Sequence, residues 1–389
     1  MKMKRRNAIC IFGLLIIALS VVVLVVLKKN DNIKIGTEKI DIGDYSKLSR
    51  IGREYLLYLK DISDANDGSI LAEEVDINIL PVYKKKNYVK SEDGKFSFTM
   101  SLSCERVERI AKEIGEKIGS GVKNIEYTYY KDCYNYSSVR ETKLNEQMQN
   151  IASANITFEN EVCALVYNNG KIILGNINDA VPGKYPGCFG DLCWGDKLIS
   201  DEEAGNVLKY LADKYGAYVE MKSPTYCYYS GSSYSHRYIG YEDSGTIRER
   251  IVNHDLNYID FYFDEYDGVC RDITLFNAWE YVDYIGDYPI ISVDKATKLL
   301  LLGEYITDSP QEYLCFMSIK DADIKRITIN YVNVRGYYIP VYKFYVDITE
   351  GRDKYIAQTK YVDDLDEDYK VYGVLYVPAI EDTYLNGYN

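Results

Sequence analysis

The chain has 389 residues, a net charge of −13 and 47% hydrophobic residues, and tyrosine is unusually frequent with 41 copies. This composition supports sizeable hydrophobic cores and excludes a chain that is disordered throughout. The negative charge argues against nucleic acid as a partner, because the phosphate backbone is itself anionic. The length is compatible with two or three domains.

Residues 8–27 form an almost unbroken apolar run, and its flanks carry six basic residues and no acid (Lys2, Lys4, Arg5, Arg6, Lys28 and Lys29). A helix of about 20 residues spans about 30 Å, the thickness of the hydrocarbon core of a bilayer. We therefore predict a transmembrane anchor at 8–27 and a cytoplasmic tail at 1–7, because the stronger basic cluster stays inside the cell. The rest of the chain is then extracellular and carries a net charge of −19, since the anchor region removes six positive charges.

A cleaved signal peptide is the main alternative to this anchor. Its apolar run is normally shorter and ends in a small-x-small cleavage site. Ala18 and Ser20 are candidates for such a site, but seven apolar residues follow them. A lipoprotein is disfavoured because Cys10 lies at the start of the run. The sequence thus predicts a single-pass protein of the cell membrane.

Three segments share one pattern: an aliphatic residue, a serine, an acid two positions further on, and then an apolar helical stripe. They begin at Leu102, Ile199 and Ile291, which are 97 and 92 residues apart. The serines are expected N-caps, and the acids suit the positive end of the helix dipole (Ser103, Ser200 and Ser292; Glu105, Glu202 and Asp294). In the second copy Glu203 completes a capping box with Ser200. The stripes predict three amphipathic helices (107–118, 204–211 and 296–300).

Strand signals follow each predicted helix. Asn169-Gly170 and Asp267-Gly268 separate β-rich runs and predict hairpins. The glycines of these turns follow the starts of their copies by 68 and 69 residues, which indicates a shared module. Further strands are expected between and after them (125–130, 327–331, 341–348, 354–359 and 369–377).

These elements predict an α+β fold: an N-terminal transmembrane helix followed by tandem modules, each with one helix laid on an antiparallel sheet. Residues 28–75 are expected to form a stalk or linker with a short helix at 45–62, where apolar residues recur at helical spacing. The three modules are expected at 76–190, 191–290 and 291–389.

A Ser-x-[Asp/Glu]-x-Ala helix start before a small antiparallel sheet resembles PepSY-type modules and the related exported regulators that sit beside cell-wall sensor kinases in Gram-positive bacteria. The motif recurs in the second and third copies, whereas the first has Val107 in place of alanine (Ser200, Glu202, Ala204; Ser292, Asp294, Ala296). The anchor and the stretches 339–345 and 375–380 are also similar to uncharacterised membrane-anchored proteins of clostridial type. This resemblance implies a binding or regulatory role and no reaction.

Common catalytic motifs are missing from the sequence, which has no Gly-x-x-x-x-Gly-Lys, no His-Glu-x-x-His and no Gly-x-Ser-x-Gly. With only His236 and His254 in the chain, a histidine metal site or a nucleophile with a histidine base is disfavoured. Both histidines are expected to be ordinary surface residues. The stretch 61–74 fails as a calcium loop because Ala65 stands at a ligand position, and the acids in 363–368 are expected in a solvated loop. We therefore predict no catalytic residue, no metal site and no cofactor, and leave the binding residues open.

Eight of the nine cysteines lie outside the anchor, an even number that permits disulfides in an exported region. Only Cys188 and Cys193 are close enough in sequence to predict a local loop closure, and free buried cysteines remain an open alternative. The tyrosine excess also has two open explanations: half-buried strands, or a surface that binds sugars or peptides.

The favoured hypothesis is a non-catalytic extracytoplasmic protein that binds, and regulates, a membrane protein or peptide of the cell envelope. Exposed sheet edges would allow strand addition as the binding mode. One alternative is a glycan-binding protein or a cell-wall glycan hydrolase that uses two carboxylates in a tyrosine-lined cleft. Another is a structural tether without a specific partner. The oligomeric state is left open.

Overall fold

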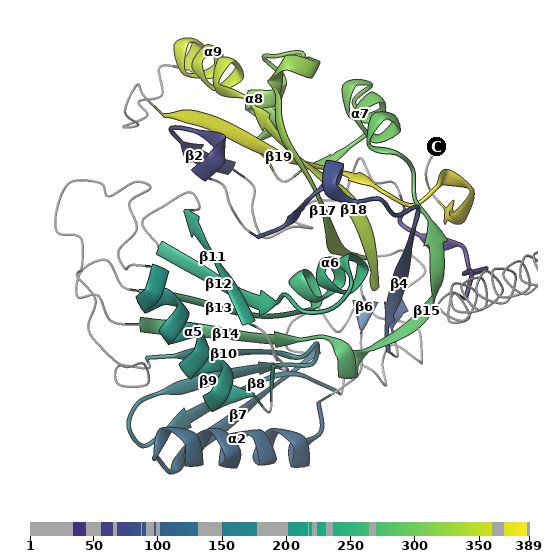
Figure 1. Cartoon of the computed structure of the whole chain (residues 1–389). Coiled ribbons are helices and arrows are strands. Elements are labelled where there is room, and N and C mark those ends of the chain that lie inside the picture. The colour runs from purple at the N-terminus through teal and green to yellow at the C-terminus, as the bar shows by residue number, and fades with distance from the viewer. Residues whose placement is uncertain are drawn as a thin grey trace, which may run out of the picture.

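The computed structural model describes residues 34–43, 56–64, 68–86, 88–90, 97–98, 102–130, 150–176, 201–216, 218–219, 224–230, 236–263, 270–307, 309–359 and 369–386. It has a mixed α+β fold with mainly antiparallel sheets, so the predicted fold class is confirmed at this level (Figure 1). The predicted tail and anchor, 1–7 and 8–27, lie outside these residues. Within the described ranges, no helix is long and apolar enough to cross a membrane.

The first two repeat copies together form one eight-stranded antiparallel sheet, here called the repeat sheet. The first copy comprises α2 (Cys104–Ile118), β7 (Val122–Tyr129), β8 (Ile151–Phe158), β9 (Cys163–Tyr167) and β10 (Lys171–Gly175). The second comprises α5 (Asp201–Tyr215), β11 (Pro224–Ser230), β12 (His236–Glu242), β13 (Asn257–Phe263) and β14 (Cys270–Asn277). The last strands of the two copies, β10 and β14, pair with each other. Each half of the sheet therefore runs in chain order from an edge to the centre.

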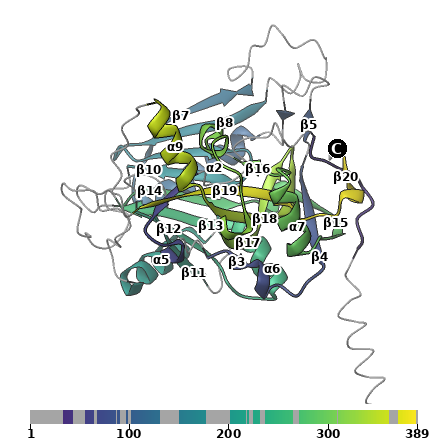
Figure 2. The ribbon, with the colours of Figure 1, turned by 90° about the horizontal axis from the view of Figure 1, so that it is seen from above.

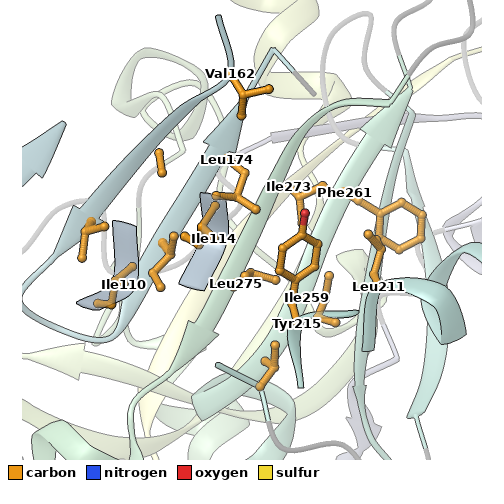
Figure 3. Close-up of a cluster of buried hydrophobic side chains, with 14 of the residues drawn as sticks. Ile110, Ile114, Val162, Leu174, Leu211, Tyr215, Ile259, Phe261, Ile273 and Leu275 are labelled. Atoms are coloured by element: carbon orange, nitrogen blue, oxygen red, sulfur yellow. The ribbon is translucent and has the colours of Figure 1, made fainter. Parts of the chain in front are cut away.

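Both repeat helices bury their apolar stripes in one core on the repeat sheet (Figure 3). Ile110 and Ile114 from α2 and Leu211 and Tyr215 from α5 lie in the same cluster as strand residues such as Phe261. Side chains that recur every three or four residues share a helix face, and burial of that face drives the packing. The predicted stripes of the first two helices are thus confirmed.

Capping and turn residues mark where several of these helices and strands begin and end, as the sequence predicts. The Ser103 side chain accepts from Arg106 N at 3.2 Å, and α2 ends at Gly119, whose φ of 67° is left-handed. The Asn169-Gly170 turn joins β9 to β10 as predicted. The second predicted turn, 267–268, lies outside the described residues, although the strands on either side of it pair antiparallel. The capping box of the second copy also lies outside them, because Ser200 does.

The second large sheet combines strands from both ends of the chain and is here called the composite sheet. Its centre is β18 (Tyr337–Asp347), which pairs with β17 (Ile324–Val334) on one side and with β19 (Lys370–Pro378) and β4 (Ile79–Lys85) on the other. The remaining strands are β2 (Leu56–Leu59), β3 (Ile70–Leu71), β15 (Val282–Pro289) and β16 (Ile306–Thr307). Three helices accompany these strands in the chain: α7 (Val293–Leu301), α8 (Gln311–Leu314) and α9 (Thr349–Thr359). Two small sheets pair β1 (Ile40–Asp41) with β20 (Leu385–Asn386) and β5 (Val89–Lys90) with β6 (Ser97–Phe98).

Residues 34–43, here called the strap, lie along the composite sheet. Gly36 N donates to Asp287 O at 2.9 Å on β15, and Ile40 and Ile42 are completely buried. The strap includes β1, which pairs with β20, and Figure 2 shows β20 beside the C-terminal end of the chain. These residues, which belong to the stalk or linker expected over 28–75, are therefore packed against the composite sheet.

Helix α6 (Ile247–Leu256) lies between the two large sheets (Figure 1). It contacts β17 of the composite sheet and β12 and β13 of the repeat sheet. A capping box fixes its start: Glu249 N donates to the Thr246 hydroxyl, and Thr246 N donates to the Glu249 carboxylate at 2.7 Å. Ile251, Val252 and Leu256 are buried in the core of the composite sheet. The helix therefore packs the two sheets against each other.

Two predicted elements are wrong. The described part of the helix expected over 45–62 is a strand at 56–59, which pairs with β19, followed by a bend and the first residue of the short 3-10 turn Ile62–Asp64; residues 45–55 lie outside the described residues. The strand expected over 354–359 belongs to helix α9, whose start is held by the Asp347 carboxylate, which accepts from Thr349 N at 3.2 Å. Pairing and packing with distant residues override local spacing in both cases.

Strand pairing also crosses the limits of the predicted modules. β10 pairs with β14, and β4 pairs with β15 and β18. The limits 76–190, 191–290 and 291–389 stay predictions about the folding units. Among the cysteines whose side chains the structure describes, Cys104, Cys163 and Cys315 are free thiols and Cys270 is a buried thiol. The predicted closure of Cys188 with Cys193 lies outside the described residues.

Replacing Gly170 by alanine is expected to destabilise the repeat sheet by about 2 to 4 kcal/mol. Its φ is +89°, and an added Cβ would lie 2.0 Å from the carbonyl oxygen of Asn277. Gly119→Ala is the matched control, because Gly119 also has a positive φ of +67° but nothing lies within 4 Å of its added Cβ. Urea unfolding of both variants measures the difference. Equal losses would show that the contact with Asn277 carries no cost.

Candidate functional site

A pocket of about 370 Å³ lies where α6 meets β4 and the turn after β14, and it is here called the junction pocket. Its wall comes from three separate parts of the chain (Pro81, Tyr83; Glu242, Ser244, Gly245, Arg248, Glu249, Val252, Asn253, Asn257; Trp279). Small-molecule and peptide sites are concave, with apolar walls and a few placed polar groups. The junction pocket is concave and has aromatic residues on its wall, but polar and charged residues make up more than half of its lining.

Aromatic rings form one wall of the junction pocket. The Tyr83 and Trp279 rings meet edge to face with their centroids 5.3 Å apart, and the Tyr331 ring lies 6.5 Å from that of Tyr83. The Tyr331 hydroxyl donates to Pro81 O at 2.7 Å, which fixes the inner ring. Burial raises the pKa of Tyr83 to about 12, so its hydroxyl stays neutral at physiological pH. The wall is thus a packed, uncharged surface.

The charged groups of the junction pocket are held by specific partners. The guanidinium of Arg248 donates to the carboxylate of Asp287, whose side chain is completely buried. The Glu242 carboxylate accepts from Ser244 N at 3.1 Å. Glu249 Oε2 accepts from Thr246 N and from the Thr246 hydroxyl, and these two bonds lower the pKa of Glu249.

A buried polar network lies behind the pocket, between α6 and β17. Asp255 Oδ2 accepts from Tyr331 N at 2.7 Å and from Asn330 Nδ2 at 3.2 Å, and Asp255 Oδ1 lies 3.1 Å from His254 Nδ1. The His254 ring packs on the edge of the Tyr241 ring. His254 is 4% exposed, so its prediction as a surface residue is wrong. The side chain of the other predicted surface histidine, His236, lies outside the described part of the chain.

Lys85 lies two positions after Tyr83 on β4, with its Nζ 5.9 Å from the centroid of the Tyr338 ring. Burial lowers the pKa of its ammonium group from 10.5 to about 8. Between pH 8 and 10.5 the unfolded chain therefore binds more protons than the folded chain, so the free energy of unfolding rises with pH across this window. Below about pH 8 the folded chain bears the whole free-energy cost of burying the charged ammonium group.

Lys85→Met is expected to stabilise the protein at pH 7 by on the order of 1 to 3 kcal/mol, because it removes this cost. The advantage over the wild type should shrink as the pH rises from about 8 to about 10.5. Urea unfolding of the two chains at several pH values in this range measures it. A variant that is less stable than the wild type at pH 7 would contradict the prediction.

A second pocket of about 260 Å³ lies between α2 and the β9–β10 turn. Arg106 donates to the carboxylate of Glu280 and lies with its guanidinium carbon 4.8 Å from the centroid of the Tyr281 ring. The Tyr218 hydroxyl donates to Glu113 Oε2 at 2.7 Å. Two pairs of polar groups on the wall of this pocket, Arg106 with Glu280 and Tyr218 with Glu113, thus bind each other.

The described residues of the acidic stretch 61–74 do not line either pocket. Asp61 accepts from Ser63 N at 2.8 Å and from the Ser63 hydroxyl, and these bonds lower the pKa of Asp61. The second half of the stretch forms the 3-10 turn Ala72–Glu74. The run 363–368 lies outside the described residues.

Sequence reasoning missed the junction pocket, for which it named no residue. The Tyr83 and Trp279 rings that meet there are 196 positions apart, and no local pattern links them. One local signal was available: Thr246-x-x-Glu249 is a capping box, which marks the start of a helix. That motif predicts α6 but not its place between two sheets.

Comparison with known proteins identifies no relative. The sequence matches no protein-family model, and no curated protein matches it.

Proposed function

We propose that the protein is a single-pass membrane protein whose extracellular part is a non-catalytic binding or regulatory module for a membrane protein or peptide of the cell envelope. Residues 8–27 are its anchor, residues 1–7 stay in the cytoplasm, and the helix-on-sheet modules lie outside. The likeness of the repeat to PepSY-type modules supports this role. The junction pocket is the ligand-binding site in this proposal.

The position of the junction pocket is the observation that carries the proposal. Its wall combines α6 and the β12–α6 loop, β4 of the composite sheet, and Trp279 just after β14. Because α6 packs on both large sheets, a ligand in the pocket contacts the elements that hold the sheets together. Pockets between packed units are common binding sites.

The position of the strap close to the predicted anchor favours a partner that lies in or on the membrane. Residue 34 follows the end of the predicted anchor, residue 27, by at most about 25 Å of extended chain. Asp287 connects the strap to the pocket, since its backbone N donates to Lys34 O at 2.7 Å and its side chain pairs with Arg248. With the anchor inserted, the composite sheet and the junction pocket lie near the bilayer surface.

A glycan hydrolase is the weaker alternative. Glu242 and Glu249 both line the junction pocket, as a two-carboxylate mechanism requires. The general acid of such a pair needs a raised pKa, however, and the bonds to Thr246 lower the pKa of Glu249, which disfavours Glu249 as that acid. Glycan binding without hydrolysis stays compatible with the aromatic wall. The structural tether predicts no specific ligand at all.

Blocking the pocket tests the proposal. Asn253 lines the pocket, so Asn253→Trp should fill it, whereas Leu302→Trp places the same side chain at a position that is 75% exposed beyond α7. The tagged full-length chains are crosslinked in their native membrane, purified and compared with the wild type. Asn253→Trp should lose an envelope partner that the other two retain, at an unchanged melting temperature. Equal recovery from all three chains would refute the pocket as the binding site.

A further inference from the structure

We infer that the junction pocket takes a basic side chain, a lysine or arginine, of the polypeptide that the protein binds. This inference rests on the proposed function and adds the chemistry of the ligand. Two observations carry it: the protein's own carboxylates already accept from the amides where an anion would bind, and one oxygen of the Glu249 carboxylate is left for a cation.

An anionic ligand is disfavoured because the protein's own carboxylates occupy the places where an anion would bind. The backbone amides before α6 are the natural anion site of this pocket. Ser244 N donates to Glu242 and Thr246 N donates to Glu249, so carboxylates of the chain already accept these bonds. Arg248 carries the one guanidinium among the described residues of the pocket wall, and it is paired with the buried Asp287.

A cation finds complementary groups in the same pocket. Both of the described hydrogen bonds to the Glu249 carboxylate go to Oε2, so Oε1 is left to accept from a ligand. The other guanidinium of this helix turn, that of Arg250, is bound to Asp243 Oδ1 at 2.6 Å and does not line the pocket. Apart from Arg248, the described residues of the wall include no cation to balance the negative charge of Glu249.

The aromatic wall suits the rest of a basic side chain. Lysine and arginine carry a long apolar stem, which packs on rings such as those of Trp279 and Tyr83, and a cationic head that is attracted to their faces. A carboxylate beside an aromatic face is an arrangement that binds ammonium and guanidinium groups. The acidic exported chain adds a long-range attraction for basic partners.

Tryptophan fluorescence tests this inference directly. The chain has two tryptophans, Trp194 and Trp279, so Trp194→Phe leaves Trp279 as the single reporter on the pocket wall. The full-length Trp194→Phe chain in detergent is titrated with acetyl-Gly-Lys-Gly-amide and with the same peptide carrying norleucine, which has a similar stem and no charge. A glutamate peptide and a chitotriose serve as the anionic and glycan probes.

The lysine peptide should shift the emission of Trp279 with a Kd about fivefold or more below that of the norleucine peptide, since a cation over an aromatic ring contributes about 1 kcal/mol. Glu249→Gln, which keeps an oxygen for Thr246, should remove most of this difference, and so should added salt. Preference for norleucine, glutamate or chitotriose, or no response to any probe, would overturn the basic side chain as the ligand. The blocking variant Asn253→Trp decides separately whether the pocket is a binding site.

Discussion

Replacing Asp255 by alanine should destabilise the protein by about 3 kcal/mol, because it leaves buried donors without their acceptor. Asp255 Oδ2 accepts from Tyr331 N and Asn330 Nδ2, and both residues are at most 5% exposed. The Tyr331 amide would have to stay in the core without this bond. Urea unfolding, with the linear dependence of stability on urea, gives the loss.

Two variants control this prediction. Asp255→Asn keeps one acceptor oxygen but turns an amide group toward the remaining donor, so its loss should be smaller, about 1 to 2 kcal/mol. Asp382→Ala removes a surface carboxylate that is 45% exposed and pairs with Lys295 at 3.1 Å, and its loss should stay below about 0.5 kcal/mol. If Asp255→Ala were as mild as Asp382→Ala, the network between α6 and β17 would not hold the sheets together.

Phe344→Ala should cost about 4 kcal/mol, the largest loss expected for a single substitution here. Phe344 is completely buried on β18, between Ile327 of β17 and Leu375 of β19 in the pairing register. Alanine would leave a cavity in the centre of the composite sheet. The urea midpoint measures the loss, and Leu302→Ala, at a position that is 75% exposed, is the control with almost none. A loss below about 1 kcal/mol for Phe344→Ala would mean that this core rearranges to fill the space.

The sequence was sufficient for features that depend on neighbouring residues. The stripe of α2 follows helical periodicity, its start follows from Ser103, and the β9–β10 turn follows from Asn169-Gly170. Each of these is decided by groups within a few positions of one another. Such features were predicted at their actual places.

Features that depend on distant pairing were not predictable in this way. Apolar residues recur at helical spacing over 45–62, yet residues 56–59 form a strand because they pair with β19, more than 300 positions later in the chain. The buried state of His254 depends on Asp255 and Tyr241, which a helix and a strand bring together. The junction pocket exists only after both sheets have formed, so its residues carry no common pattern in the sequence.

Photocrosslinking from the junction pocket is the most direct test of the central claim that this pocket contacts the partner. A benzophenone amino acid replaces Asn253 in one full-length chain and the exposed Leu302 in another, and both are irradiated in the native membrane. A discrete crosslinked product with one envelope protein or peptide is expected from position 253 and none from position 302. No product from 253, or the same products from both positions, would contradict it.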